Sequence, residues 1–436
     1  MANQVFRRLA FLIIGVLVVS FFYLGKNTFR VDSILPARLR EGTLTPSSQA
    51  NGFRPDASTT PVSVQEPIVF SLIMWSKDSA LEGALLIKSI VMHNSRPTDI
   101  HVICDDEAED VLRSRLQLVT RPRYPVRVWY IKPTWQAMYD RVEREGSLKT
   151  DHSAGLPGLM KLFIHELLPR SVTKSIFVDT DAFFITDPSL LWEVFDTLQP
   201  QTAIVMASHP NQHAPEWHDA SKICSCVILL DVKKLRDARL MASSVYTQID
   251  PNDRVEALGT TAFKAMYGLP GGDGKGRYDN VRLGDQGYWW AIVDYHQNLF
   301  EPLSYDFEVT SCIMDMYFTG LGDDTRTEED EESHHTNTRG TPQEGKVVLP
   351  KLLHFNCLHN TTVYMEWTGW KDPDNYLNYR WGAAMKFHNG YKWIWLNQGD
   401  RGHPAYTIEQ HTRSNATFLD EDLLKSWRHA HQKHQH

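Results

Sequence analysis

The first pattern along the chain is an uninterrupted apolar run, Leu9–Gly25, preceded by Arg7 and Arg8 and followed by Lys26. Its seventeen residues, at ~1.5 Å per residue, would make a helix of about 26 Å, enough to span a thin bilayer. A cleaved signal peptide has the same basic-then-apolar order, but this run ends in Phe21–Tyr23 without the small residues of a cleavage site. The pattern therefore predicts a retained transmembrane signal anchor.

Charge around this run predicts its orientation. Positive residues favour the cytoplasmic side, so residues 1–8 are expected to form a cytoplasmic tail and the rest of the chain to lie in the lumen. A short span suits the thinner membranes of the early secretory pathway, which favours the Golgi, with the ER as the second choice. Residues 26–66 contain Pro, Ser, Thr and Gly with little apolar periodicity and predict a flexible stem. Asn-x-Thr sequons at Asn360 and Asn415 suit a luminal glycoprotein.

Beyond residue 67, short apolar runs alternate with amphipathic segments. Continuous runs of the buried-strand type occupy residues 68–75, 100–104, 126–131 and 175–178. Apolar residues at helical spacing follow the first run, at Ala80, Ala84, Ile87 and Val91. This alternation predicts an α/β fold with a Rossmann-like, mainly parallel sheet flanked by helices. Ligands of such sheets bind beyond the carboxyl ends of the strands.

This domain is expected to cover residues 67–400. Within it, residues 321–346 are acidic and rich in Thr, Asn, Gly and Pro. We expect a solvated, disordered insertion there, the alternative being a metal or basic-partner site. Residues 401–436 are polar and His-rich and are expected to form a frayed C-terminal tail.

Composition narrows the function classes. With 42% hydrophobic and 22% charged residues, the chain is neither globally disordered nor a polytopic membrane protein. A formal net charge of −8 provides no basic field for nucleic acid. Five cysteines are too few for a disulfide scaffold, and their odd number leaves at least one unpaired or paired between chains.

The sharpest chemical signal is Asp179-Thr180-Asp181, directly after an apolar strand. Residues i and i+2 of an extended segment point the same way, so both carboxylates face one cavity. Such oxygens can hold a hard divalent cation, and a cation there can bridge the diphosphate of a nucleotide. Asp-x-Asp also occurs by chance, and a pair that caps a helix or solvates a strand end is the alternative.

An ordered set of motifs surrounds this pair. They are Gly155–Leu162, Thr186–Pro188, Val227–Asp231, Gly284–Trp290 and Lys351–Asn356. The set resembles the family-8 glycosyltransferases, most closely the xylosyltransferase half of LARGE-type enzymes and the xyloside xylosyltransferases. The resemblance covers roughly residues 68–356 and is most specific over residues 161–192. It implies a GT-A type fold and a metal-dependent, retaining transferase with a UDP-sugar donor and a glycan or glycoprotein acceptor.

The resemblance also implies a cation site. Asp179, Asp181 and His354 would be the metal ligands, with Thr180 between them beside the UDP phosphates. Two carboxylates and one imidazole suit Mn²⁺ better than Mg²⁺, because imidazole is the softer donor. Taken alone, a histidine at a strand end is more often a structural residue.

Other positions of the family motifs fall on residues around the donor. Lys161 corresponds to a basic residue near the donor sugar, with a solvated helix charge as the alternative. Asp285 and Gln286 match an Asp-Gln pair beneath the anomeric carbon and the sugar hydroxyls. Asp105 falls where contacts to uridine and ribose are expected, although a simple strand-end acid would look the same.

Two departures from the family pattern stand out. The family usually has Asn-Thr-Gly or Asn-Ser-Gly where this chain has Cys224-Ser225-Cys226, so the donor sugar is left open. The two cysteines share one strand face, and a buried structural role is expected for them. The usual phosphate-binding lysine after His354 is absent in register, and Lys371 is the candidate replacement.

The sequence thus predicts a type II membrane glycosyltransferase that moves a hexosyl or pentosyl unit from UDP-xylose, UDP-glucose or UDP-galactose to an acceptor hydroxyl. One alternative is a haloacid-dehalogenase-type phosphatase, but its Asp-x-Asp normally opens the domain. The other is a catalytically inactive, membrane-anchored sugar-binding or scaffold protein that keeps the fold.

Overall fold

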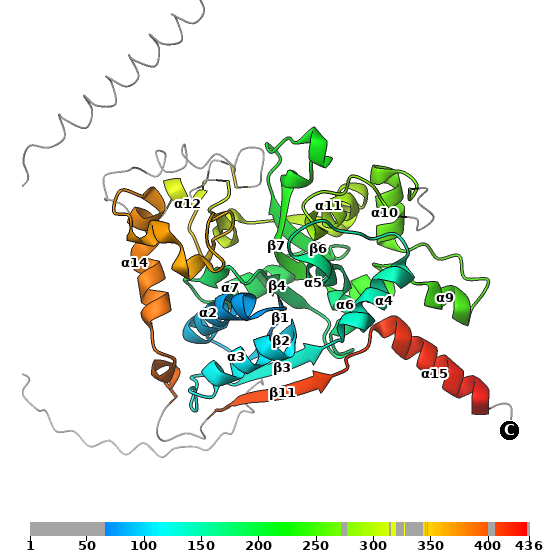
Figure 1. Ribbon diagram of the computed structural model, residues 1–436, viewed down its shortest axis with the longest axis horizontal. Helices are drawn as coiled ribbons and strands as arrows, with labels where there is room; N and C mark the ends of the chain where they lie inside the picture. The colour runs from blue at the N-terminus through cyan, green and yellow to red at the C-terminus, as the bar shows by residue number, and fades with distance from the viewer. Residues whose placement is uncertain are drawn as a thin grey trace, which may run out of the picture. The chain divides into compact units, whose positions relative to one another are not determined.

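The computed structural model describes residues 66–271, 277–313, 315–319, 327, 343–344, 346, 348–399 and 406–433. All of them belong to the unit formed by Ser63–His436 (Figure 1). The predicted cytoplasmic tail (residues 1–8), the predicted anchor (9–25) and all of the predicted stem except Glu66 lie outside the described residues. Most of the acidic insertion (321–346) also lies outside them. Within the part of the chain that is described, no helix is long and apolar enough to cross a membrane.

An eight-stranded sheet forms the centre of this unit. Its strands are β1 (Ile68–Met74), β2 (Thr98–Cys104), β3 (Val126–Lys132), β4 (Ser175–Val178), β6 (Ile204–Ser208), β7 (Ile223–Leu230), β8 (Phe300–Leu303) and β11 (Ile408–Ser414). They lie in the order β11-β3-β2-β1-β4-β7-β6-β8. Only β7 runs antiparallel to its neighbours, β4 and β6, and every other adjacent pair is parallel. The predicted α/β fold with a mainly parallel sheet is confirmed.

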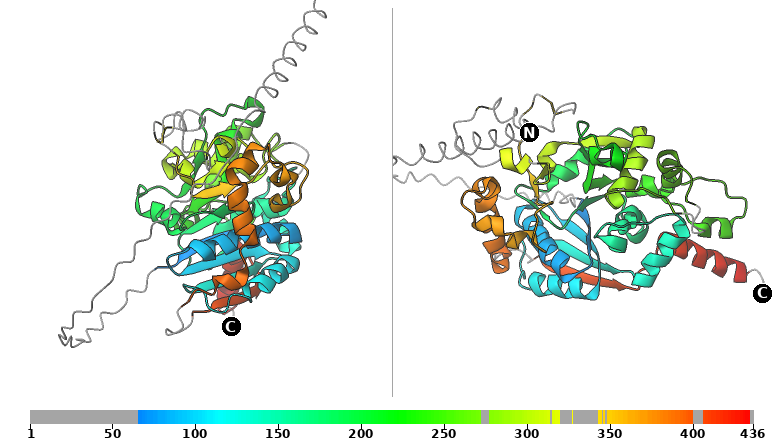
Figure 2. Two further views of the ribbon diagram at one scale, coloured as in Figure 1. Left: turned by 90° about the vertical axis from the view of Figure 1, so that its left-hand side faces the viewer. Right: turned by 45° about the horizontal axis from the view of Figure 1, so that its top comes forward.

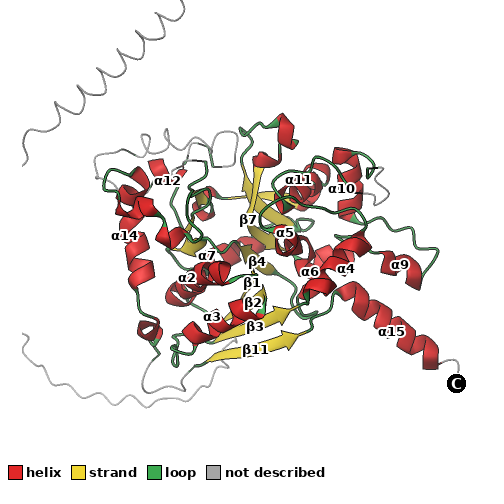
Figure 3. Ribbon diagram, viewed as in Figure 1, coloured by secondary structure: helices red, strands yellow, loops and turns green. Residues whose placement is uncertain are grey.

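Helices cover both faces of this sheet (Figure 3). They are α2 (Lys77–His93), α3 (Asp106–Leu116), α4 (Trp135–Glu145), α5 (Gly155–Leu159), α6 (Ile164–Leu167), α7 (Ser189–Trp192), α8 (Val232–Asp237), α9 (Ser244–Ile249), α10 (Leu258–Tyr267), α11 (Asp285–Tyr295), α12 (Asp315–Phe318), α14 (Tyr376–Gly390) and α15 (Leu419–Lys433). Alternate residues of the strands feed two cores. Phe70 and Val102 pack with α2 and α3, and Ile103 and Phe177 pack with α6 and α11.

A small second sheet begins just after β4 along the chain. It consists of β5 (Ala182–Phe184), β10 (Leu352–His354) and β9 (Val309–Thr310), with β10 in the middle. β10 pairs antiparallel with β5, which places His354 opposite Ala182, and parallel with β9, which places it opposite Thr310. A disulfide between Cys312 and Cys357 joins the segments that follow β9 and β10.

The predicted frayed tail is wrong for residues 406–433. β11 pairs with β3 over its whole length, from Ile408 beside Val126 to Ser414 beside Lys132, and lies along the sheet edge in Figures 1 and 2. Helix α15 follows it. The sequence pattern is misleading here because β11 is an edge strand, whose largely exposed residues are polar.

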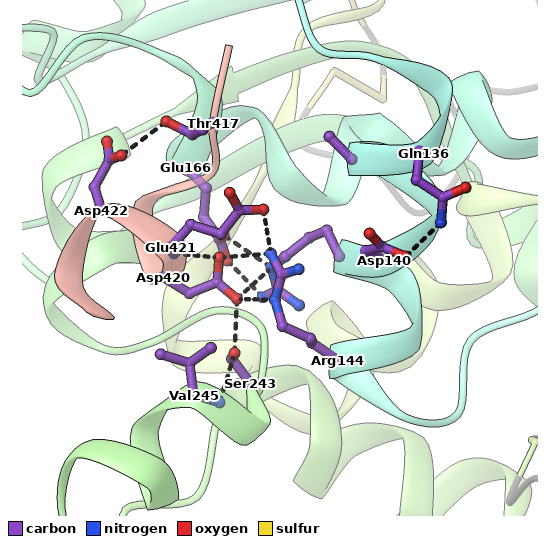
Figure 4. Close-up of polar contacts among 12 residues, drawn as sticks. Gln136, Asp140, Arg144, Glu166, Ser243, Val245, Thr417, Asp420, Glu421 and Asp422 are labelled. Atoms are coloured by element: carbon purple, nitrogen blue, oxygen red, sulfur yellow. Dashed lines mark hydrogen bonds and ion pairs between the residues drawn. The ribbon is translucent and has the colours of Figure 1, made fainter. Parts of the chain in front are cut away.

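Two ion pairs, which we call the C-terminal clasp (Arg141–Glu166 and Arg144–Asp420), lie at the start of α15, and Arg141 also lies 3.5 Å from Asp420. Figure 4 shows Arg144 and Asp420 facing each other. Arg141 donates to both oxygens of Glu166 at 2.9 and 2.6 Å, and Arg144 donates to both oxygens of Asp420 at 2.8 and 2.9 Å. The Ser243 hydroxyl adds a 2.7 Å bond to Asp420. Burial alone would raise the pKa of Asp420, but these partners hold it below its ordinary value.

Candidate active site

The Asp-x-Asp motif lies at the junction of the two sheets. β4 ends at Val178, and the Asp179 amide then donates to the carbonyl of Cys226 on β7 at 2.8 Å. The carbonyl of Asp181 accepts a 2.8 Å bond from the amide of Phe355, just beyond β10. The backbone of both aspartates is therefore fixed by neighbouring strands, at the carboxyl end of β4 where parallel sheets bind ligands.

The three residues predicted as metal ligands come together at this junction. Nε2 of His354 lies 3.2 Å from Oδ1 of Asp181. Ligand atoms of Asp179, Asp181 and His354 all lie within 4.8 Å of one another. The two aspartate side chains are 29% and 27% exposed, whereas His354 is buried. The carboxylates are thus open to a ligand, with the imidazole behind them.

Lys161 and Asp285 complete what we call the site cluster (Asp179, Asp181, His354, Lys161 and Asp285). Lys161 comes from the 3₁₀ turn η1 (Met160–Phe163), and its Nζ lies 2.9 Å from Asp179 and 3.5 Å from Asp285. Asp285 is the first residue of α11 and accepts a 2.9 Å bond from the hydroxyl of Ser225. One ammonium therefore links two carboxylates that lie more than a hundred residues apart in the sequence.

Burial and like charge shift the ionisation of this cluster. Burial, with Asp181 nearby, raises the pKa of Asp179 to about 6 despite the opposing charge of Lys161. Burial would also raise the pKa of Asp181, but His354 holds it below its ordinary value. The pKa of His354 is correspondingly raised well above 6.5, because Asp181 outweighs the effect of burial. The cluster therefore favours bound positive charge.

Two further acids belong to the site and were missed from the sequence. Glu308 is fully buried, with Oε1 3.4 Å from Nδ1 of His354, so it faces the ring nitrogen opposite to Asp181. Glu82 of α2 accepts a 3.4 Å bond from the Thr180 hydroxyl, and burial and Asp181 raise its pKa to about 8. Glu308 precedes a strand of two residues, which is too short for a pattern to reveal.

Three predicted residues are placed less directly. Asp105 directly follows β2, and its side chain caps α3 by accepting from the Ala108 amide at 2.8 Å. The Gln286 amide donates to the carbonyl of Ala220 at 2.9 Å. Lys371 is exposed, and no described contact of the site cluster involves it. Their roles toward a donor stay predictions.

Comparison with known proteins gives partial matches. No protein-family model matches the chain. Over 181 residues, 41% of this chain, it is 29% identical to xylosyl- and glucuronyltransferase LARGE1 of Mus musculus. Over 151 residues, 34% of this chain, it is 32% identical to xylosyl- and glucuronyltransferase LARGE2s of Gallus gallus. The matched part of the chain is similar in sequence to the LARGE-type glycosyltransferases.

The predicted resemblance is therefore confirmed. The matches span about a fifth of these LARGE-type relatives, 22% of the mouse protein and 18% of the chicken protein. Solved structures with a similar arrangement include mouse xyloside xylosyltransferase 1 in its apo form, 16% identical with a TM-score of 0.45, covering 67% of this chain and 99% of that one. Galactosyltransferase LgtC with donor and acceptor sugar analogues is 10% identical with a TM-score of 0.46, covering 74% and 95%.

The structure shows what surrounds Cys224-Ser225-Cys226, where the sequence departs from the expected family motif. The register of β7 against β6 jumps between Met206 and Ala207, so β7 bulges over this segment. A disulfide joins Cys224 to Cys226, while the hydroxyl of Ser225 bonds Asp285 and its carbonyl accepts from Lys161 at 3.3 Å. The altered motif thus remains in contact with the site cluster.

The donor set fits a divalent cation. Carboxylate oxygens and one imidazole nitrogen are hard to borderline ligands of the kind that Mn²⁺ accepts. In the site cluster, three aspartates face one lysine and one histidine, so positive charge is in deficit. A cation bound by Asp179, Asp181 and His354 would supply that charge.

Proposed function

We propose that this protein is a glycosyltransferase, which transfers a hexosyl or pentosyl unit from a UDP-sugar to a hydroxyl of a glycan or glycoprotein with retention of anomeric configuration. The observation that carries the proposal is the meeting of Asp179, Asp181 and His354 at the carboxyl end of β4. The relationship to LARGE-type enzymes supports the reaction class. UDP-xylose, UDP-glucose and UDP-galactose are the candidate donors, and a GT-A type fold is the corresponding architecture.

The proposed cofactor is Mn²⁺, held by Asp179, Asp181 and His354. When bound, it would supply positive charge that attracts the donor diphosphate and stabilises the diphosphate as a leaving group. Thr180, whose hydroxyl bonds Glu82, lies between the two aspartates and is proposed to face the same phosphates.

The side chains suit a front-face substitution, in which the donor phosphate takes the proton of the acceptor hydroxyl. Lys161 carries a positive charge beside Asp179 and would stabilise the departing diphosphate. Asp285 is held through Oδ2 by both Ser225 and Lys161. We assign it to positioning the sugar beneath the anomeric carbon, because a carboxylate held in this way is a poor nucleophile.

The cellular setting is proposed from the sequence. An anchor at residues 9–25, with basic residues before it, supports a single-pass type II topology in the Golgi membrane with the domain in the lumen. A full-length chain with Asn415→Gln tests this. If the wild type carries one more glycosidase-sensitive glycan than Asn415→Gln, the luminal orientation is supported. If the wild type carries no glycan and the two chains have the same mass, that orientation is contradicted.

The activity is tested with the purified full chain and a panel of UDP-sugars, with Mn²⁺ and then with chelator. We expect UDP release with one donor, dependent on Mn²⁺, and thermal stabilisation by the same pair. Asp179→Asn should abolish release, while Asp196→Asn, an exposed acid of η2 (Glu193–Asp196), should not. If no donor shifts the melt and Asp179→Asn melts like wild type, the inactive scaffold becomes the better description.

A further inference from the structure

A second group of metal-ligand side chains lies behind His354. Ligand atoms of Cys224, Cys226, Glu308 and His354 all lie within 4.8 Å of one another, and we call these four residues the sulfur cluster. It shares His354 with the site cluster but uses the other ring nitrogen. Nε2 faces Asp181 at 3.2 Å, whereas Nδ1 faces Glu308 at 3.4 Å.

The disulfide form leaves the carboxylate of this cluster poorly satisfied. Both oxygens of Glu308 lie 2.7 and 2.8 Å from Sγ of Cys226, which carries no proton while it is bonded to Cys224. Among the described residues, the remaining close partner of this carboxylate is Nδ1 of His354. A fully buried carboxylate ordinarily has several donors or a cation beside it. This arrangement therefore leaves the carboxylate with one imidazole as its partner where two sulfurs and an oxygen converge.

We propose that the sulfur cluster is a second cation site, specific for a thiophilic divalent ion such as Zn²⁺, which exists when Cys224 and Cys226 are reduced. Two thiolates, one carboxylate oxygen and one imidazole nitrogen make the four-ligand set that Zn²⁺ takes in proteins. Cys226, Glu308 and His354 are buried, while Cys224 is partly exposed and gives the ion a way in. The disulfide and the cation are alternative occupants of the same sulfurs.

A phosphine reductant takes up the oxygen of water as its oxide and converts the disulfide into two thiols. Binding of Zn²⁺ then releases the two thiol protons. Because a neutral imidazole offers a single lone pair, His354 serves one cation at a time, so zinc on the sulfur cluster weakens binding of Mn²⁺ to the site cluster.

The test uses the full chain, reduced with a phosphine, and Co²⁺ as a spectroscopic probe. Thiolate-to-cobalt charge transfer should appear in the near ultraviolet at one equivalent and vanish when Zn²⁺ is added. The band should be absent from the unreduced chain and from the Cys224→Ser/Cys226→Ser double variant. Glu308→Gln should weaken cobalt binding at least tenfold.

Matched controls separate this site from its surroundings. Cys104→Ser removes the buried unpaired cysteine, and Cys312→Ser/Cys357→Ser removes the other disulfide. Both should keep the band. Asp179→Asn should keep it too, even though it abolishes the proposed transfer, so the two proposals fail independently.

A second measurement covers the case in which reduction loosens the fold. Zn²⁺ at one equivalent should slow alkylation of Cys224 and Cys226 at least tenfold and leave Cys104 unchanged. No charge-transfer band in the reduced wild type, or no slowing of alkylation, overturns the proposal. A band that survives loss of both Cys224 and Cys226 also overturns it.

Discussion

The site cluster and the C-terminal clasp are both groups of charged side chains brought together by the fold, but their charges are matched differently. In the clasp, two guanidinium groups each hold one carboxylate through two hydrogen bonds. In the site cluster, three aspartates share one lysine and one histidine, at distances of 2.9 to 3.5 Å. Planar two-point pairing balances the charges of the clasp within the protein, whereas the described residues of the site cluster carry more negative than positive charge.

The difference indicates what each cluster contributes. A buried pair whose members are fully bonded is costly to break, because the surviving charge is left without a partner. A cluster of like charges held together by the fold stores repulsion that a ligand relieves, which is a property of functional sites. Substitutions should therefore separate the two, with the clasp governing stability and the site cluster governing turnover.

The largest effect is expected for Asp179→Asn. Transfer should fall at least about 100-fold, equivalent to about 3 kcal/mol of transition-state stabilisation. The free energy of unfolding should change by less than about 1 kcal/mol, because the raised pKa shows that the fold already disfavours the ionised carboxylate. Steady-state kinetics and urea unfolding on the same preparation measure both. A variant that unfolds early would assign Asp179 a structural role instead.

The opposite outcome is expected for Asp420→Ala. Loss of this buried carboxylate leaves Arg144 with its single 2.9 Å bond to Glu421 and should cost about 3 kcal/mol of unfolding free energy, with turnover per folded molecule unchanged. Asp422→Ala, two residues away and bonded to the Thr417 hydroxyl, should cost less than about 1 kcal/mol. If the two variants unfold at the same urea concentration, the clasp does not contribute specifically to stability.

Two serine substitutions test the same separation of turnover from stability, with smaller expected effects. Ser225 and Ser243 each donate one hydroxyl bond to an aspartate, at 2.9 Å in the site and 2.7 Å in the clasp. Bonds to charged groups contribute ~1.5–3 kcal/mol. Ser225→Ala should lower turnover about tenfold, and Ser243→Ala should lower stability by about 1.5 kcal/mol instead. Similar kinetic losses in both variants would contradict the separation.

The smallest effect concerns pH. The pKa of Asp420 is held below its ordinary value in the folded state, so its contribution is present above the ordinary aspartate pKa and is lost as pH falls through the folded value. The stability gap between wild type and Asp420→Asn should thus be largest near pH 6 and narrow toward pH 3. Urea midpoints across this range measure it, and a gap that widens in acid would contradict the assignment.

Much of the fold follows from the apolar runs. The residues expected to form strands lie in β1 to β4, apart from Trp75, and the helix face marked by Ala80 and Ile87 is buried. Elements of two or three residues, such as β5 and β9, exist only because tertiary pairing extends them, and no local pattern marks them. Their register brings His354 to Asp181, so the sequence could name this pair only through the family resemblance.

Other features escaped for the same physical reason. Glu308 and Glu82 are isolated acids whose importance lies in what surrounds them. Arg141 lies in an amphipathic helix whose charged residues suggest an exposed face, yet it is fully buried. β11 is polar because it has a neighbour on one side only. Hydrophobic periodicity detects residues that are buried by apolar packing. It misses residues that are buried through ion pairs or placed by strand pairing.

The place of β11 in the sheet has a consequence for biosynthesis. Residues 408–414 leave the ribosome long after β3, whose outer edge they cover. During translation that edge exposes unpaired backbone groups, which other chains can pair with. The nascent domain should therefore depend on chaperones until its last strand arrives, and a chain cut short before Ile408 should aggregate or be degraded.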